Sequence, residues 1–105
     1  MELKRVVVTG LGAITPLGKT VSEYWEGLTN GVSGADYIQQ FDCTKFKTRF
    51  ACEVKDFDPL NYFDRKEARK IDRFTQLSLI ASDEAVKDAG ISKDNVNPDR
   101  VGVIF

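Results

Sequence analysis

The stretch that decides the fold is RVVVTGLGAITPLG, residues 5–18. Its three consecutive valines, residues 6–8, place β-branched side chains on both faces of any strand they form. Such a strand is stable only when both faces are covered, as in the middle of an α/β sheet. The glycines at positions 10, 12 and 18 and the proline at 16 then let the chain leave along a tight path. We therefore expect a buried strand at the start of a layered α/β fold.

An apolar strand followed by Gly10-x-Gly12 also suggests a dinucleotide-binding turn. That fingerprint needs a third small residue at the position of Thr15 and a helix that begins at once. Pro16 biases Thr15 toward an extended conformation, which delays any helix. We therefore predict no cofactor site at this turn.

Length and composition restrict the function further. The 105 residues form one domain at most, 42% of them are apolar, and the net charge is −1. No run approaches the roughly 20 apolar residues of a membrane span, and a near-neutral chain disfavours bulk nucleic-acid binding. No signal-peptide pattern follows Met1, so we expect a cytoplasmic protein.

Residues able to carry chemistry are scarce. Cys43 and Cys52 are the only cysteines, and histidine is absent. Two cysteines without histidine do not make an ordinary zinc site, so no metal is predicted. Cys52 is interpreted as a small core residue and Cys43 as a bystander beside a turn. Since a nucleophile needs a base or cationic neighbour, the catalytic residues are expected elsewhere.

Capping residues predict where the first half of the chain is helical. Thr20 and Glu23 have the spacing of a capping box before a helix at residues 21–29, which ends at Asn30-Gly31. Trp25 on its apolar face is interpreted as a packing anchor. Short strands are expected at residues 36–41 and 49–54, the second with Phe50, Cys52 and Val54 on its apolar side.

The second half is predicted to be mostly helical. Asp58-Pro59 begins a short turn at residues 59–63, and Asp64 with Glu67 offers another cap and its partner. One straight helix to Gly90 would place basic residues and Leu77 on the same stripe, so we predict a break at Asp72. The later helix should bury six apolar residues: Phe74, Leu77, Ile80, Ala81, Ala85 and Val86. Small residues at positions 81, 85 and 89 should allow a close approach to this helix.

Residues 100–105, RVGVIF, are predicted to form a second apolar core strand. Strands of this type normally lead into a loop that carries chemistry. We therefore expect the chain to be a piece of a larger protein. In isolation its uncovered apolar strands should make it aggregate.

The segment DRKEARKIDR, residues 64–73, holds five basic and three acidic side chains. One interpretation is a solvated helix face on which Glu67 pairs with a neighbouring Lys or Arg. The other is a docking patch for an acidic partner, centred on Lys66, Arg69 and Lys70. Arg73 and the basic residues at 45, 47 and 49 are weaker candidates for the same patch. Nucleic acid is disfavoured because no aromatic residues alternate with these charges.

The order of motifs resembles the N-terminus of the β-ketoacyl-acyl-carrier-protein synthases, closest to the bacterial type II condensing enzyme of fatty-acid elongation. The motifs that carry the resemblance are RVVVTGLGAITPLG, a Trp-bearing helix, FDCTKF, FACEVKDFDP and RKEARKIDRFTQLSLIASDEAVKDAG. The resemblance covers essentially all of residues 1–105 but only the opening part of a family chain. It implies a thiolase-like layered α-β-α-β-α fold, of which residues 1–105 are part of the N-terminal half, and a homodimer.

The resemblance also implies a decarboxylative Claisen condensation between acyl and malonyl groups on acyl carrier protein, without a cofactor. The nucleophilic cysteine and two histidines of such enzymes find no match here, so no catalytic residue is assigned. Family members receive the acidic carrier protein on a basic helix, and the matching residues are Lys66, Arg69 and Lys70. The alternatives are a polyketide ketosynthase, its inactive partner subunit, or a non-catalytic binding module.

Overall fold

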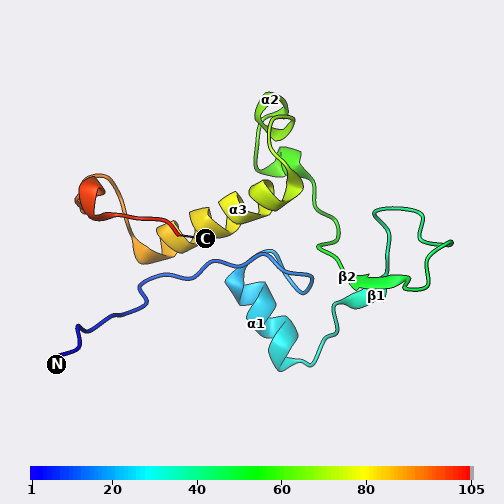
Figure 1. Ribbon diagram of the computed structural model, residues 1–105, viewed down its shortest axis with the longest axis horizontal. Coiled ribbons are helices and arrows are strands. Elements are labelled where there is room, and N and C mark those ends of the chain that lie inside the picture. Colours follow the sequence, from blue (N-terminus) through cyan, green and yellow to red (C-terminus); the bar gives the residue numbers. More distant parts are fainter. Residues whose placement is uncertain (105) are drawn as a thin grey trace.

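The computed structural model describes residues 1–104. Along the chain come α1 (Val21–Thr29), β1 (Ala35–Tyr37), β2 (Phe50–Cys52), η1 (Pro59–Asn61), α2 (Arg65–Ala68), α3 (Arg73–Ala89) and η2 (Pro98–Arg100). In Figure 1, α3 crosses the middle of the molecule, α2 projects from its beginning, and the β1–β2 hairpin extends to one side. The radius of gyration is 17.5 Å, whereas a compact domain of this length has about 13 Å. The arrangement is therefore open.

The helix ends follow the capping residues. The Thr20 hydroxyl accepts from the Glu23 amide at 3.2 Å, and α1 ends before Gly31, whose φ is +68°. The reciprocal bond of a capping box is shifted by one residue, because the Glu23 carboxylate accepts from the Lys19 amide at 2.7 Å. The break between α2 and α3 is confirmed at Asp72, although the Asp72 side chain makes no capping bond. Gly90, with φ +66°, ends α3.

The glycine segment, residues 10–18, lies directly against α3. A Cβ added at Gly12 would lie 1.8 Å from the Ala81 carbonyl oxygen, and one at Gly10 would lie 2.3 Å from that of Ala85. The small residues of α3 thus permit the close approach that the sequence predicts. Two α3 carboxylates fix the contact: Asp88 accepts from the Leu11 amide at 3.0 Å, and Glu84 accepts from Ala13 and Val21, each at 2.9 Å.

The valine segment, residues 5–9, corrects the expectation of a buried strand. It is not part of any sheet, and Val6, Val7 and Val8 are 89%, 60% and 80% exposed. The predicted last strand is wrong for residues 100–104 in the same way: η2 ends at Arg100, and residues 101–104 are exposed. Phe105 lies outside the described residues. The physical reason is shared, because a strand requires a hydrogen-bonded neighbour and residues 1–104 place none beside either segment.

The two predicted short strands do pair, over fewer residues than expected. β1 and β2 run antiparallel, with Ala35 opposite Cys52 and Tyr37 opposite Phe50. No second layer covers this hairpin within residues 1–104, so Phe50 and Cys52 are both exposed, and Cys52 is not the core residue that the alternation indicates. Cys43 is half-buried in the connecting loop.

No large apolar side chain is buried anywhere in residues 1–104. On α3, Leu77 and Ile80 are half-buried, whereas Phe74 and Val86, both predicted to face inward, are exposed. Trp25 is 66% exposed, so it is not the packing anchor that its helical position suggests. These elements form apolar faces that residues 1–104 leave largely uncovered.

Candidate functional site

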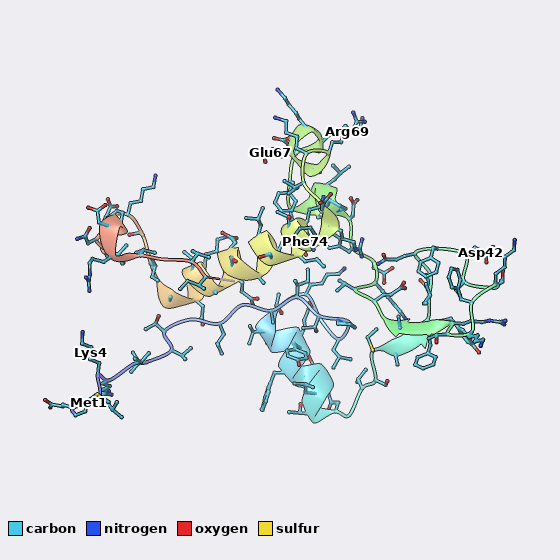
Figure 2. The ribbon with its side chains drawn as sticks, viewed as in Figure 1. Met1, Lys4, Asp42, Glu67, Arg69 and Phe74 are labelled. Atoms are coloured by element: carbon cyan, nitrogen blue, oxygen red, sulfur yellow. The ribbon has the colours of Figure 1, made fainter. Side chains whose placement is uncertain are left out.

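The basic patch, Lys66, Arg69 and Lys70, sits on and just after α2. This helix begins where Asp64 Oδ1 accepts from the Glu67 amide at 2.8 Å, as the sequence predicts. All three basic side chains of the patch are exposed. Figure 2 shows Arg69 and Glu67 on the part of α2 that projects farthest from α3. The patch therefore stands on a protruding tip that a partner can approach.

The basic patch carries no ion pair within the described chain. Two salt bridges occur in residues 1–104, Lys55–Asp36 and Lys87–Asp83, and neither lies on α2. In particular, Glu67 does not pair with Lys70, although that pairing is the basis of the solvated-face interpretation. The positive charges of the patch are thus available to an outside partner.

Arg73 does not join the basic patch. Its Nη2 donates to the Val54 carbonyl oxygen at 2.8 Å, and its guanidinium lies 4.9 Å from the centre of the Phe57 ring. A guanidinium over an aromatic face gains a cation–π attraction in addition to the hydrogen bond. Arg73 therefore fixes the segment after β2 against the start of α3 and is not a docking residue.

The basic residues at 45, 47 and 49 also lie apart from α2. They belong to the loop between β1 and β2, and Figure 1 shows that loop at the right of the view, separated from α2 at the top. Arg49 Nε donates to the Phe46 carbonyl oxygen at 3.1 Å, which ties this side chain to its own loop. The basic residues at 45, 47 and 49 therefore do not extend the basic patch, contrary to the expectation from the sequence.

Gln76 is the site residue that the sequence analysis misses. It is the one buried polar side chain of residues 1–104, with 6% of its surface exposed. Its Nε2 donates to the Ala68 carbonyl oxygen at 3.0 Å, which ties α3 to the last residue of α2. The available signal was a polar residue beside Leu77 on the otherwise apolar stripe of α3.

Two carboxyl groups on the hairpin have perturbed acidity. A hydrogen bond and ion pair from Lys55, with a second bond from the Tyr37 amide, lowers the pKa of Asp36. The Thr44 backbone amide lowers the pKa of Asp42 in the connecting loop. Figure 2 shows Asp42 far from Arg69, so this acidity is unrelated to the basic patch.

The glycine segment cannot hold a pyrophosphate. A dinucleotide site needs free backbone N–H groups at the turn and room for the phosphates. Here the amides of Leu11 and Ala13 already donate to α3 carboxylates, and α3 fills the space beside Gly10 and Gly12. The glycines of this segment thus serve its close packing against α3.

A hollow of about 1090 Å³ lies between α1, the η1 region and α3, with Trp25, Phe63 and Leu79 among its lining residues. Apolar side chains supply most of its exposed surface, and charged side chains of α3, among them Glu84 and Asp88, also line it. Among residues 1–104, no group of three or more His, Cys, Asp or Glu side chains could hold a metal ion. No described helix is both long and apolar enough to cross a membrane.

Comparison with known proteins shows which family the sequence matches. Residues 3–105 match the family model of the β-ketoacyl synthase N-terminal domain. The 3-oxoacyl-[acyl-carrier-protein] synthase 2 of Synechocystis sp. is 48% identical over all 105 residues. The chain spans 25% of that relative's length.

Two solved structures share the fold. The ishigamide ketosynthase/chain length factor matches with a TM-score of 0.75 and 39% identity, over 86% of this chain and 22% of that one. The AntDE:AntF complex, a type II PKS acyl-carrier protein with its ketosynthase, matches with a TM-score of 0.63 and 26% identity, over 88% and 24%. The open arrangement described above thus matches about a quarter of each of these two thiolase-like structures, and the chain belongs to the β-ketoacyl synthase N-terminal domain family.

Proposed function

We propose that residues 1–105 are the opening part of the N-terminal half of a β-ketoacyl-acyl-carrier-protein synthase. In the full-length protein, an enzyme thiol takes an acyl group from carrier protein. Decarboxylation of malonyl-carrier protein then gives a carbanion that attacks this thioester, which yields 3-oxoacyl-carrier protein, CO2 and the free thiol. Family membership and 48% identity to a 3-oxoacyl-[acyl-carrier-protein] synthase 2 support this reaction class. The family resemblance further implies a homodimer for the full-length protein, and we propose the cytoplasm as its compartment.

Within that enzyme, residues 1–105 supply framework and carrier docking, and the catalytic residues lie outside them. A catalytic thiolate is favoured at a helix N-terminus or beside a cationic group. Cys52 lies in the exposed β2 strand, and Cys43 Sγ lies 3.8 Å from the Arg49 carbonyl oxygen and 4.0 Å from that of Ile38. The absence of histidine from the sequence supports the same view.

The observation that carries the docking proposal is the unpaired basic patch on the tip of α2. Exposed positive charges steer an acidic partner, raise its association rate and set its orientation, and added salt weakens all three effects. Acyl carrier protein is the acidic partner that the family resemblance implies. The AntDE:AntF structure supports this choice, because there a ketosynthase of the same fold is in complex with an acyl-carrier protein.

The test is to reverse two charges of the patch, Lys66→Glu with Arg69→Glu, in the full-length protein. At low ionic strength we expect affinity for acyl-carrier protein to fall by roughly tenfold or more, with a shallower dependence on salt. The matched control, Lys4→Glu with Lys93→Glu, changes the net charge equally at exposed positions away from α2 and should leave affinity nearly unchanged. If affinity and salt dependence survive the reversal at positions 66 and 69, the patch is only a solvated helix face.

A polyketide ketosynthase, or its inactive partner subunit, is the second candidate. The 39% identity and TM-score of 0.75 to a ketosynthase/chain length factor favour it. The discriminating measurement is condensation by the full-length protein. Release of CO2 with repeated two-carbon extension supports polyketide synthesis, a single condensation supports fatty-acid elongation, and no reaction supports the inactive subunit. An autonomous binding module lacks support, because no large apolar side chain of residues 1–104 is buried.

A further inference from the structure

Gln76 occupies an unusual position at the base of the basic patch. It is buried, and its amide nitrogen reaches back eight residues to the Ala68 carbonyl oxygen at 3.0 Å. Ala68 is the last residue of α2, where a helix leaves carbonyl groups without partners. The side chain therefore completes the end of α2 from outside that helix.

Few interactions hold α2 in place, and one of them is its packing against η1. A helix of four residues is far below the length at which a helix is stable by itself. The Asp64 cap is internal to the turn, since it bonds the Glu67 amide. In residues 1–104, the Gln76–Ala68 bond is the one hydrogen bond that joins α2 to α3. Besides the packing of α2 against η1, the orientation of α2 on α3 is thus held by this one hydrogen bond.

We propose that Gln76 is a positioning residue for carrier-protein docking. This inference rests on the function proposed above. By holding the Ala68 carbonyl group, it fixes the direction in which Lys66, Arg69 and Lys70 are presented. Preorganised charges spare the partner the cost of ordering them on binding, whereas a loose α2 would present the same charges in many orientations. Gln76 itself contacts no partner, since it is buried beneath the patch.

The test replaces Gln76 in the full-length protein with Leu, which has a similar size and no donor. We expect the KM for acyl-carrier protein to rise roughly three- to tenfold, in line with the loss of one buried hydrogen bond. The KM for an acyl-pantetheine thioester without carrier protein, and kcat, should stay unchanged. Gln76→Met serves as a second donor-free variant if the Leu variant does not fold. Gln76→His places an N–H at a similar reach and should restore most of the affinity.

A double-mutant cycle separates this inference from the function beneath it. If Gln76 acts through the patch, Gln76→Leu should add almost nothing in the background of Lys66→Glu with Arg69→Glu. A fully additive effect, or an equal loss with acyl-pantetheine, overturns the positioning role and leaves docking intact. An unchanged KM for acyl-carrier protein in both the Leu and the Met variant would also overturn the positioning role. If the charge reversal alone has no effect on carrier binding, it is the docking function that fails.

Discussion

The glycine segment and the valine segment adjoin in the sequence but differ in what holds them. The glycine segment lies against α3, where Glu84 and Asp88, more than 60 residues away along the chain, accept hydrogen bonds from backbone amides in or just after it. The valine segment has the stronger β propensity, yet it pairs with nothing and stays exposed. The difference shows that β-branched residues do not make a strand by themselves. The neighbouring element determines whether a segment is held in place. Within residues 1–104, the glycine segment has α3 beside it, and the valine segment has no strand beside it.

The largest effect is expected where the glycine segment touches α3. In Gly12→Val, the new Cβ would meet the Ala81 carbonyl oxygen at 1.8 Å, so the segment must move away and lose its bonds to Glu84 and Asp88. We expect a loss of about 3 kcal/mol or more in the free energy of unfolding of the full-length protein, seen as a lower Tm by calorimetry. Equal Tm values for the Gly12 variant and the unchanged protein would contradict the packing role.

A smaller effect is expected at the carboxylate that links the glycine segment to α1. Glu84 accepts from two backbone amides through its two oxygens. In Glu84→Gln one oxygen becomes an NH2 group, which leaves one amide unpaired at a cost of about 1–3 kcal/mol. Urea denaturation of the full-length protein measures this change.

The control for Glu84 is the neighbouring Asp83→Asn. Asp83 pairs with Lys87 on the exposed face of α3, with side chains 62% and 75% exposed. Surface pairs of this kind contribute little, so the free energy of unfolding should change by no more than about 0.5 kcal/mol. Equal losses of unfolding free energy in the two variants would mean that Glu84 does not hold the glycine segment and α1 together.

The same contrast explains how much of the fold was predictable. The ends of α1 and α3 and the positions of η1 and α2 follow from Thr20, Asp58, Asp64 and Gly90, because each cap or terminal turn acts within three or four residues of itself. The strands at both ends were predicted from side chains alone, and they are absent from residues 1–104 because no strand lies beside either segment to pair with it. The prediction that Cys52 is a core residue was wrong for a related reason, because an alternating pattern gives a buried face only when a second layer covers the strand.

The candidate site divides along the same line. The exposure of Lys66, Arg69 and Lys70 follows from the charge pattern, and the predicted break at Asp72 separates them from the apolar stripe of α3. Arg73 and Gln76 were beyond such reasoning because their partners, Val54, Phe57 and Ala68, lie on irregular or terminal segments. No periodicity connects a helix face to a loop carbonyl group.

The smallest effect is expected at the hairpin, where an exposed ion pair takes the place of buried anchors. Asp36 pairs with Lys55, and its folded pKa lies below the ordinary 3.8. Because the folded pKa is the lower one, the pair stabilises the hairpin above about pH 4, and this contribution disappears as the pH falls through the folded value. An NMR titration of the Asp36 carboxyl carbon should therefore give a midpoint below 3.8. Lys55→Met should raise that midpoint while leaving the Asp42 midpoint, which depends on the Thr44 amide, unchanged. If Lys55→Met leaves the Asp36 midpoint unchanged, the ion pair contributes nothing and the hairpin is held by its backbone pairing alone.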